Sequence, residues 1–195
     1  RAAAQNITIC AGFAAAFGDK FNVVHAIVEP AGRVLFQRKA FRASTEPTFL
    51  APWPDPARTP FEVEGARVVV VICSEMGVAP VMAEVARCAP DLILHPSAGC
   101  MKEIELIRAD RPVSPEALAF DDNCQRVVDR AVPRIREHGI PRMGSNPVGF
   151  DGETWWPGNS YGVDAGGTVR LRINGENHPE RMMGAMAVGD MPLKV

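Results

Sequence analysis

The chain has 195 residues, of which 47% are hydrophobic and 23% charged, and this composition is typical of one globular domain spanning residues 1–195. The formal net charge of −2 gives no electrostatic reason to expect a nucleic acid or a membrane surface as partner. No apolar run reaches the roughly 20 residues that span a bilayer. The N-terminus has no signal-peptide pattern. We therefore expect a cytoplasmic protein.

The first sixty residues predict a strand meander followed by a long loop. Residues 1–13 have the pattern of a helix end that runs into a strand. Strand-like runs at residues 7–12 and 22–29 flank the turn signal "FGDK", and "EPAGR" turns the chain into "VLFQRKAF". Five prolines between residues 42 and 60 exclude a helix or a central strand. Long loops of this kind inside a compact domain are often functional.

Residues 67–96 predict a strand, a helix and a second strand. The run "RVVVVIC" is apolar on both faces, "VMAEVARCA" has helical spacing, and "DLILHPSA" is a short apolar strand, which together indicate a βαβ unit with parallel strands. A further helix is predicted over residues 123–138, with Asn123 as its N-cap, a kink at Pro133 and Gly139 just after its end. The tail is turn-rich and returns to strands. The pattern predicts an α/β fold.

The cysteines are odd in number and widely scattered, so they indicate neither a disulfide framework nor a zinc site. Among them, Cys73 ends a strand just before a helix begins, the position at which open α/β sheets build their ligand sites. Backbone N–H groups at such a point would favour a thiolate and could hold a developing oxyanion. The alternative is a thiol packed under the helix. The five cysteines are Cys10, Cys73, Cys88, Cys100 and Cys124.

Lys39 is the second candidate, because only four of the 21 basic residues are lysines. At a strand end beside Arg38 it could serve as a compact ammonium, or it could be a solvated surface lysine. Glu46 follows seven residues later, in the proline-rich loop, where its carboxylate could keep the lysine charged. Glu75 lies two residues after Cys73 and could act as a base towards the thiol. The alternative for both glutamates is that they are simply solvated.

His95 precedes a proline at the end of the second apolar strand. It could pair with Cys73 as a cysteine–histidine dyad, or it could be a satisfied core histidine. The glycines at positions 162, 166 and 167 do not form a phosphate-binding loop, and we expect them to mark turns.

Four ordered blocks resemble the nitrilase superfamily of carbon–nitrogen hydrolases. The stretch "VVVVICSEMGVAPVMAEVARCAPDLILHPSA" is similar to the family's nucleophile block, in which a strand ends in Ile-Cys, an acidic residue follows two places later, and a short helix leads to an apolar strand ending in proline. The stretch "FNVVHAIVEPAGRVLFQRKAF" looks like the segment that carries the family's lysine. Two later stretches, "RIREHGIPRMGSNPVG" and "PGNSYGVDAGGTV", resemble further family blocks, so the resemblance covers nearly the whole chain.

The resemblance implies a catalytic set and a reaction. Cys73 falls on the nucleophile, Lys39 on the catalytic lysine and Glu46 on the loop glutamate, while the backbone N–H of Ser74 is expected to stabilise the oxyanion. The implied reaction is hydrolysis of a non-peptide carbon–nitrogen bond through a cysteine thioester, with no metal or cofactor. Ser74 replaces a frequent aromatic and Ala83 a usual arginine, so amide, nitrile and carbamoyl substrates all remain open.

The resemblance also implies an architecture and an assembly. The family fold is a four-layer α-β-β-α sandwich, commonly assembled as a homodimer or a higher homo-oligomer that acts on a small molecule. The family's general base is a glutamate upstream of the segment that matches residues 2–12, so we expect this chain to be truncated at its N-terminus. The alternative is a non-catalytic nitrilase-like subunit or binding module. A different cysteine enzyme that uses His95 is a third possibility.

Overall fold

The computed structural model describes residues 2–44, 46–98, 131–150, 155–157, 160–173 and 192. The chain divides into two compact units, residues 1–94 and residues 95–195. Each unit has its own apolar cluster. Cys73, Lys39, Glu46 and Ser74 all belong to the first unit.

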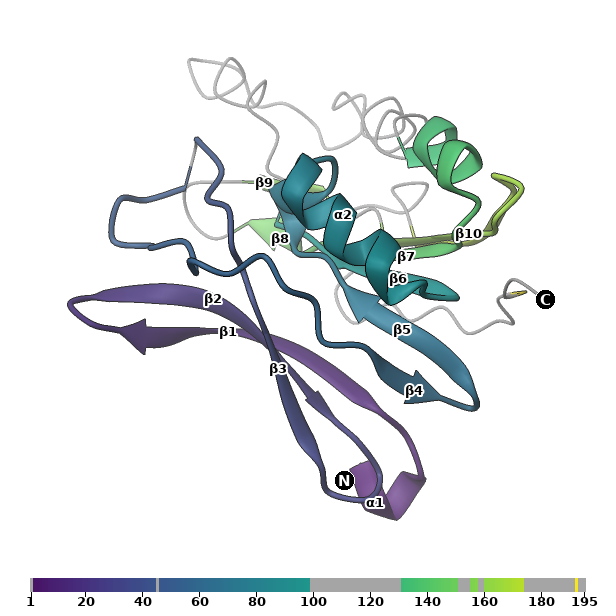
Figure 1. Cartoon of the computed structure of the whole chain (residues 1–195), viewed down its shortest axis with the longest axis horizontal. Coiled ribbons are helices and arrows are strands. Elements are labelled where there is room, and N and C mark those ends of the chain that lie inside the picture. The colour runs from purple at the N-terminus through teal and green to yellow at the C-terminus, as the bar shows by residue number, and fades with distance from the viewer. Residues whose placement is uncertain are drawn as a thin grey trace. The chain divides into compact units, whose positions relative to one another are not determined.

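The first unit begins with an antiparallel meander of three strands in the order β1-β2-β3 (Figure 1). The first hairpin turns at Gly18, whose φ of 61° is a conformation that glycine adopts without steric cost. The predicted meander is confirmed, but its first strand extends beyond residues 7–12, because the alanine-rich run also pairs across the hairpin, as far as Phe17 opposite Lys20. The bounds are Ala2–Gln5 for helix α1, Ile9–Phe17 for β1, Lys20–Val28 for β2 and Val34–Arg38 for β3.

A βαβ unit follows the proline-rich loop. Strands β5 and β6 are parallel, with Val68 opposite Leu92, and helix α2 connects them, which confirms the prediction. Strand β4 pairs antiparallel with β5. The described residues of the loop over residues 42–60 contain no helix or strand beyond a single bridge at Leu50, also as predicted. The bounds are Phe61–Val63 for β4, Ala66–Val70 for β5, Ala79–Cys88 for α2 and Leu92–Pro96 for β6.

Two sheet faces pack together in the first unit. Ile27 of β2 lies in one apolar cluster with Phe61 of β4 and with Val68 and Val70 of β5. Alternate residues such as Val69, which is fully buried, point to the opposite face of β5, where helix α2 lies (Figure 1). The first unit therefore has a sheet, a second sheet and a helix in successive layers, and the predicted α/β class is confirmed.

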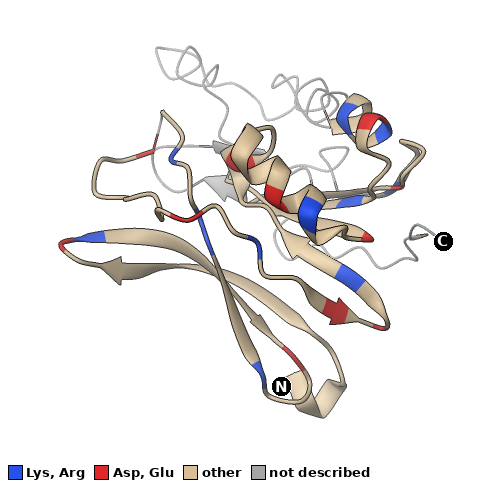
Figure 2. Cartoon of the chain, viewed as in Figure 1, with Lys and Arg blue, Asp and Glu red and all other residues tan. Residues whose placement is uncertain are grey.

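One face of the β1–β3 sheet is apolar and partly exposed. Phe13, Val34 and Phe36 lie on this face and are 45%, 45% and 51% exposed. Figure 2 shows that strands β1 and β2 carry almost no charged residues along their length. No helix in the described part of the first unit covers this face. The fourth layer of the predicted sandwich thus stays a prediction.

The second unit contains a helix over residues 131–138 and an antiparallel sheet in which β10 lies between β7 and β11. Gly139 ends the helix in a left-handed conformation, as predicted, whereas Asn123 lies outside the described residues. Gly162 lies inside β10 rather than in a turn, which corrects that expectation. The bounds are Arg142–Ser145 for β7, Val148–Phe150 for β8, Trp155–Pro157 for β9, Ser160–Val163 for β10 and Val169–Ile173 for β11.

Among the described residues, no helix is both long and apolar enough to cross a membrane.

Candidate active site

Cys73 opens a turn shortly after the buried strand β5, which ends at Val70. The chain stays extended through Val71, whose N–H donates to the carbonyl of Leu94 over 2.9 Å, and then forms a single 3-10 turn over Cys73–Glu75. The φ of Cys73 is 50°, a left-handed value that is uncommon for a residue with a side chain. Such strained residues cluster at functional sites, where the surrounding structure holds them in place. The half-buried thiol at a strained strand end is the arrangement expected of a presented nucleophile.

Ser74 follows Cys73 in the same turn and is exposed. The expected oxyanion donor is the backbone N–H of Ser74, which forms the peptide bond with Cys73. A donor so close to a nucleophile can stabilise an oxyanion without movement of a side chain.

Lys39 follows the last residue of β3 and is only 3% exposed. Its backbone N–H donates to the carbonyl of Val23 over 2.9 Å. Its carbonyl accepts from the side chain of Asn22 over 2.9 Å and from the N–H of Trp53 over 2.8 Å. The alternative of a solvated surface lysine is therefore wrong: the fold fixes the backbone of Lys39 on three sides and buries its stem.

Glu46 forms an ion pair with the Lys39 ammonium through Oε1. Its other carboxylate oxygen accepts from the N–H of Ala43 over 2.8 Å, and its side chain is 20% exposed. A small pocket opens at this pair, lined by the residues Val23, Lys39, Arg42, Glu46, Leu50, Ala51 and Pro52. The structure thus brings the side chains of Lys39 and Glu46 together at a small pocket.

Glu75 is fully buried and joins the turn of Cys73 to the segment of Lys39. Its Oε1 accepts from the N–H of Ala40 over 2.6 Å and from Arg58 Nη2 over 3.0 Å. Its Oε2 accepts from the N–H of Ile72 over 3.0 Å and from Arg58 Nη1 over 3.3 Å. Both carboxylate oxygens are engaged by donors, which favours a structural role for Glu75 over that of a base towards the thiol.

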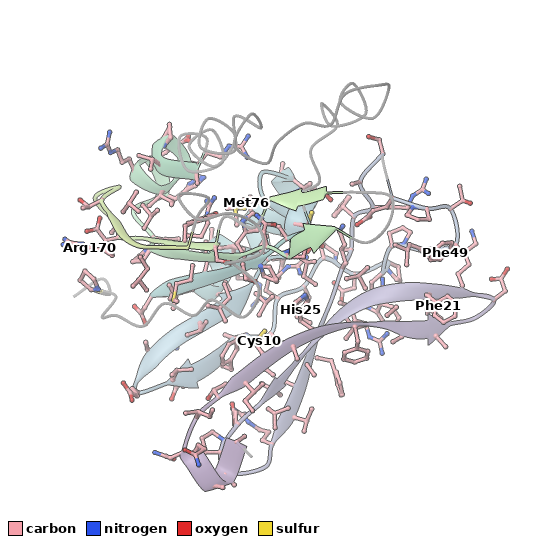
Figure 3. All side chains as sticks on the ribbon, turned by 180° about the vertical axis from the view of Figure 1, so that it is seen from behind. Cys10, Phe21, His25, Phe49, Met76 and Arg170 are labelled. Carbon is pink, nitrogen blue, oxygen red and sulfur yellow. The ribbon has the colours of Figure 1, made fainter. Side chains whose placement is uncertain are left out.

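The structure describes two other thiols, of which Cys88 is buried and Cys10 is half-buried. Cys88 closes helix α2 and is buried. Cys10 and His25 lie together on the β1–β2 hairpin, with Cys10 Sγ 3.7 Å from His25 Nδ1 (Figure 3). Burial raises the pKa of the Cys10 thiol to about 11, and burial likewise lowers the pKa of His25. A thiol with a raised pKa is a poor nucleophile at neutral pH.

His95 lies in β6 and has hydrogen-bond contacts at both ring nitrogens. Nδ1 is 3.2 Å from the hydroxyl of Tyr161, and Nε2 is 3.3 Å from the hydroxyl of Ser97. These contacts are those expected of a histidine whose ring nitrogens are satisfied near its own strand.

Arg58 is the residue of this region that the sequence pattern did not single out. It is one of 17 arginines, and nothing in its local sequence distinguishes a buried guanidinium from a surface one. Among the residues that the structure describes, no cluster of three or more histidine, cysteine, aspartate or glutamate side chains is arranged to hold a metal ion.

Neither a protein-family model nor a curated protein matches the sequence of this chain. Its fold does match solved structures. An amidase of the nitrilase superfamily from Nesterenkonia AN1 has a TM-score of 0.67 at 16% identity, over 89% of this chain and 59% of that one. Another structure of that amidase, which carries the acetamide moiety of fluoroacetamide at the active-site cysteine, has a TM-score of 0.66 at 16% identity over the same shares.

The glutamine-dependent NAD+ synthetase of Acinetobacter baumannii, solved with ADP, has a TM-score of 0.67 at 14% identity, over 86% of this chain and 29% of that one. This chain thus spans about 59% of the length of the Nesterenkonia amidase and less than a third of the synthetase. At these identities the similarity establishes the fold. The resemblance to the nitrilase superfamily is therefore supported at the level of the fold.

Proposed function

We propose that this chain carries the active site of a carbon–nitrogen hydrolase of the amidase and nitrilase type, with Cys73 as nucleophile, Lys39 and Glu46 as its charged partners and the Ser74 N–H as oxyanion donor. The observation that carries the proposal is the buried Lys39 ammonium paired with Glu46 at a pocket, in the same unit as a strained cysteine at a strand end. The shared fold with nitrilase-superfamily amidases supports it.

In the proposed first half-reaction, the thiolate of Cys73 attacks the electrophilic carbon of an amide. The negative charge that develops on the oxygen is stabilised by the Lys39 ammonium and the Ser74 N–H. The carbon–nitrogen bond then breaks, ammonia or an amine leaves with a proton, and a thioester remains on Cys73. Glu46 holds the Lys39 ammonium in place, since the carboxylate of Glu46 is itself fixed by the N–H of Ala43.

In the second half-reaction, water attacks the thioester carbon and the thiol leaves as a carboxylic acid forms. This step needs a general base to take a proton from the water. The resemblance assigns that base to a glutamate upstream of the segment that matches residues 2–12. Neither Glu46, which is paired with Lys39, nor Glu75, which is enclosed by four donors, fits that role.

We also propose an architecture, a location, an assembly and a substrate class for this protein. The domain would be a four-layer sandwich that spans residues 1–195, and the protein would act in the cytoplasm as a homodimer or a higher homo-oligomer. The substrate would be a small amide, with nitriles and carbamoyl compounds as the other classes open to the same catalytic set. No metal or cofactor takes part in the proposed reaction.

The test is ammonia release from a panel of small amides and nitriles by the protein expressed from its full open reading frame. Wild-type protein is expected to hydrolyse at least one member of the panel. Cys73→Ala is expected to lower that rate by at least about a thousandfold, because the step that forms the covalent intermediate is lost. Circular dichroism would confirm that the variant is folded. Cys10→Ala, which changes a half-buried thiol on strand β1, is the matched control and should retain the wild-type rate.

Turnover that survives Cys73→Ala would contradict the proposed mechanism. A folded wild-type protein with no turnover and no acyl adduct across the panel would instead favour the non-catalytic alternative.

A further inference from the structure

The ion pair between Arg58 and Glu75 has both side chains fully buried. Two guanidinium nitrogens reach the two carboxylate oxygens, over 3.0 Å and 3.3 Å. A buried ion pair is weak evidence for a stabilising role, because desolvation of the two charges offsets much of their attraction. A two-point contact between a guanidinium and a carboxylate also fixes the relative geometry of the two groups.

The backbone contacts of the pair show which geometry is fixed. Glu75 accepts from the N–H of Ala40, the residue after Lys39, and from the N–H of Ile72, the residue before Cys73. On the other side of Lys39, the Arg38 carbonyl lies 3.5 Å from Arg58 Nη1. One carboxylate therefore connects the two segments that carry the ammonium and the thiol.

From these contacts we propose that Arg58 and Glu75 are positioning residues that set the Lys39 segment against the turn of Cys73, an inference that rests on the function proposed for those two residues. Neither side chain touches the substrate in this scheme. Their effect is indirect, since a displacement of about 1 Å between reacting groups can lower a rate about a hundredfold.

The experiment compares the full-length wild-type protein with the double variant Arg58→Met/Glu75→Gln. The double variant removes both charges together, so no unpaired charge stays buried. The glutamine side chain has one acceptor oxygen instead of two, so it can accept hydrogen bonds from only some of the backbone N–H groups that bind Glu75. Glu84→Gln is the matched control, because it breaks an exposed ion pair with Arg87 on helix α2. Three quantities are measured: the melting temperature, amide hydrogen exchange, and the rate at which acrylamide adds to each thiol.

In the double variant we expect amide exchange at Ala40 and Ile72 to become at least about tenfold faster while Val69 keeps its protection. Acrylamide addition to Cys73 should slow by about tenfold or more. The Glu84→Gln control should match the wild type in all three measurements. If the double variant does not fold, Arg58→Lys replaces it, since this change keeps the charge and loses the two-point contact.

A folded variant with wild-type exchange at Ala40 and Ile72, or with a wild-type rate of acrylamide addition to Cys73, would overturn the positioning role. The proposed function fails in a different way. If Cys73 of the wild-type protein reacts no faster than Cys88, the nucleophile assignment is wrong, whereas amide exchange at Ala40 still decides whether the pair holds the two segments together.

Discussion

At the scale of single residues, the site depends on one lysine whose surroundings make it unlike a surface cation. The stem of Lys39 is buried and its backbone is held by three hydrogen bonds, so the ammonium has little freedom to move. An electrostatic group that is fixed before the reaction begins costs no reorganisation when charge develops on the substrate. The ion pair with Glu46 keeps that charge in place at the pocket.

The first residue-scale prediction concerns the charge of Lys39. We expect Lys39→Met to lower kcat by about 100- to 1,000-fold, because the change removes the ammonium and preserves most of the buried volume. Steady-state kinetics with the best amide of the panel would measure it. Lys20→Met, at the exposed tip of the first hairpin, is the control and should have no effect. A kcat within threefold of the wild type would show that the ammonium takes no part in the reaction.

The second residue-scale prediction concerns the pH dependence of Cys10. Burial raises the pKa of this thiol to about 11, so its thiolate is lost as the pH falls below that value. At pH 8 about one thiol in a thousand is ionised, and this fraction rises about tenfold per pH unit up to pH 10. Peptide mapping after acrylamide treatment should therefore find Cys10 unmodified at pH 7 to 8 and increasingly modified above pH 9. Rapid acrylamide modification of Cys10 at pH 7 would contradict the raised pKa of this thiol.

At the scale of structural elements, the proline-rich loop over residues 42–60 brings the site together. It supplies Glu46 to Lys39 and Arg58 to Glu75, although it has no helix and no strand among its described residues. Aromatic contacts also hold the loop to the meander. Trp53 packs on Phe17, and Phe49 packs on Phe21 (Figure 3). Its composition predicted an ordered and functional loop, and these contacts show how the order arises.

The element-scale prediction concerns strand β7 in the second unit. A methyl group added at Gly144 would lie 2.4 Å from Cε1 of the buried Tyr161 ring on the neighbouring strand β10. We expect Gly144→Ala to lower the free energy of unfolding by about 1–3 kcal/mol, because the ring must move within a packed core. Urea denaturation would measure this change. Gly166→Ala, where the nearest atom would be 3.4 Å away, is the control and should change stability little.

The order of strands and helices could be predicted from sequence because the apolar periodicity is strong. The βαβ unit is one example: β5 is apolar on both faces and α2 has helical spacing. The extent of β1 could not be predicted, because its alanines have no marked preference for strands. The role of Glu75 could not be predicted either, since a glutamate two residues after a cysteine has the same sequence signal whether it accepts a proton or backbone hydrogen bonds.

At the scale of the whole molecule, the fold and the catalytic set have support of different kinds. The α/β fold matches solved amidases over 89% of the chain. The three residues predicted to form the catalytic set rest on local geometry instead: a strained Cys73, a buried Lys39 and a paired Glu46. The choice of these residues could be predicted, because the order of the stretches that resemble the nitrilase superfamily indicated which residues to consider. The burial of Arg58 depends on tertiary packing, which the sequence pattern does not encode locally.

The central claim is that Cys73 forms a covalent bond with the substrate. It is tested most directly by acid quenching the wild-type protein during turnover of a small amide and mapping the peptides by mass spectrometry. We predict an acyl group on the peptide that contains Cys73, sensitive to hydroxylamine as a thioester is, and its absence in Cys73→Ala. Ammonia release with no such adduct on Cys73, or with the adduct on Cys10 or Cys88, would contradict the claim.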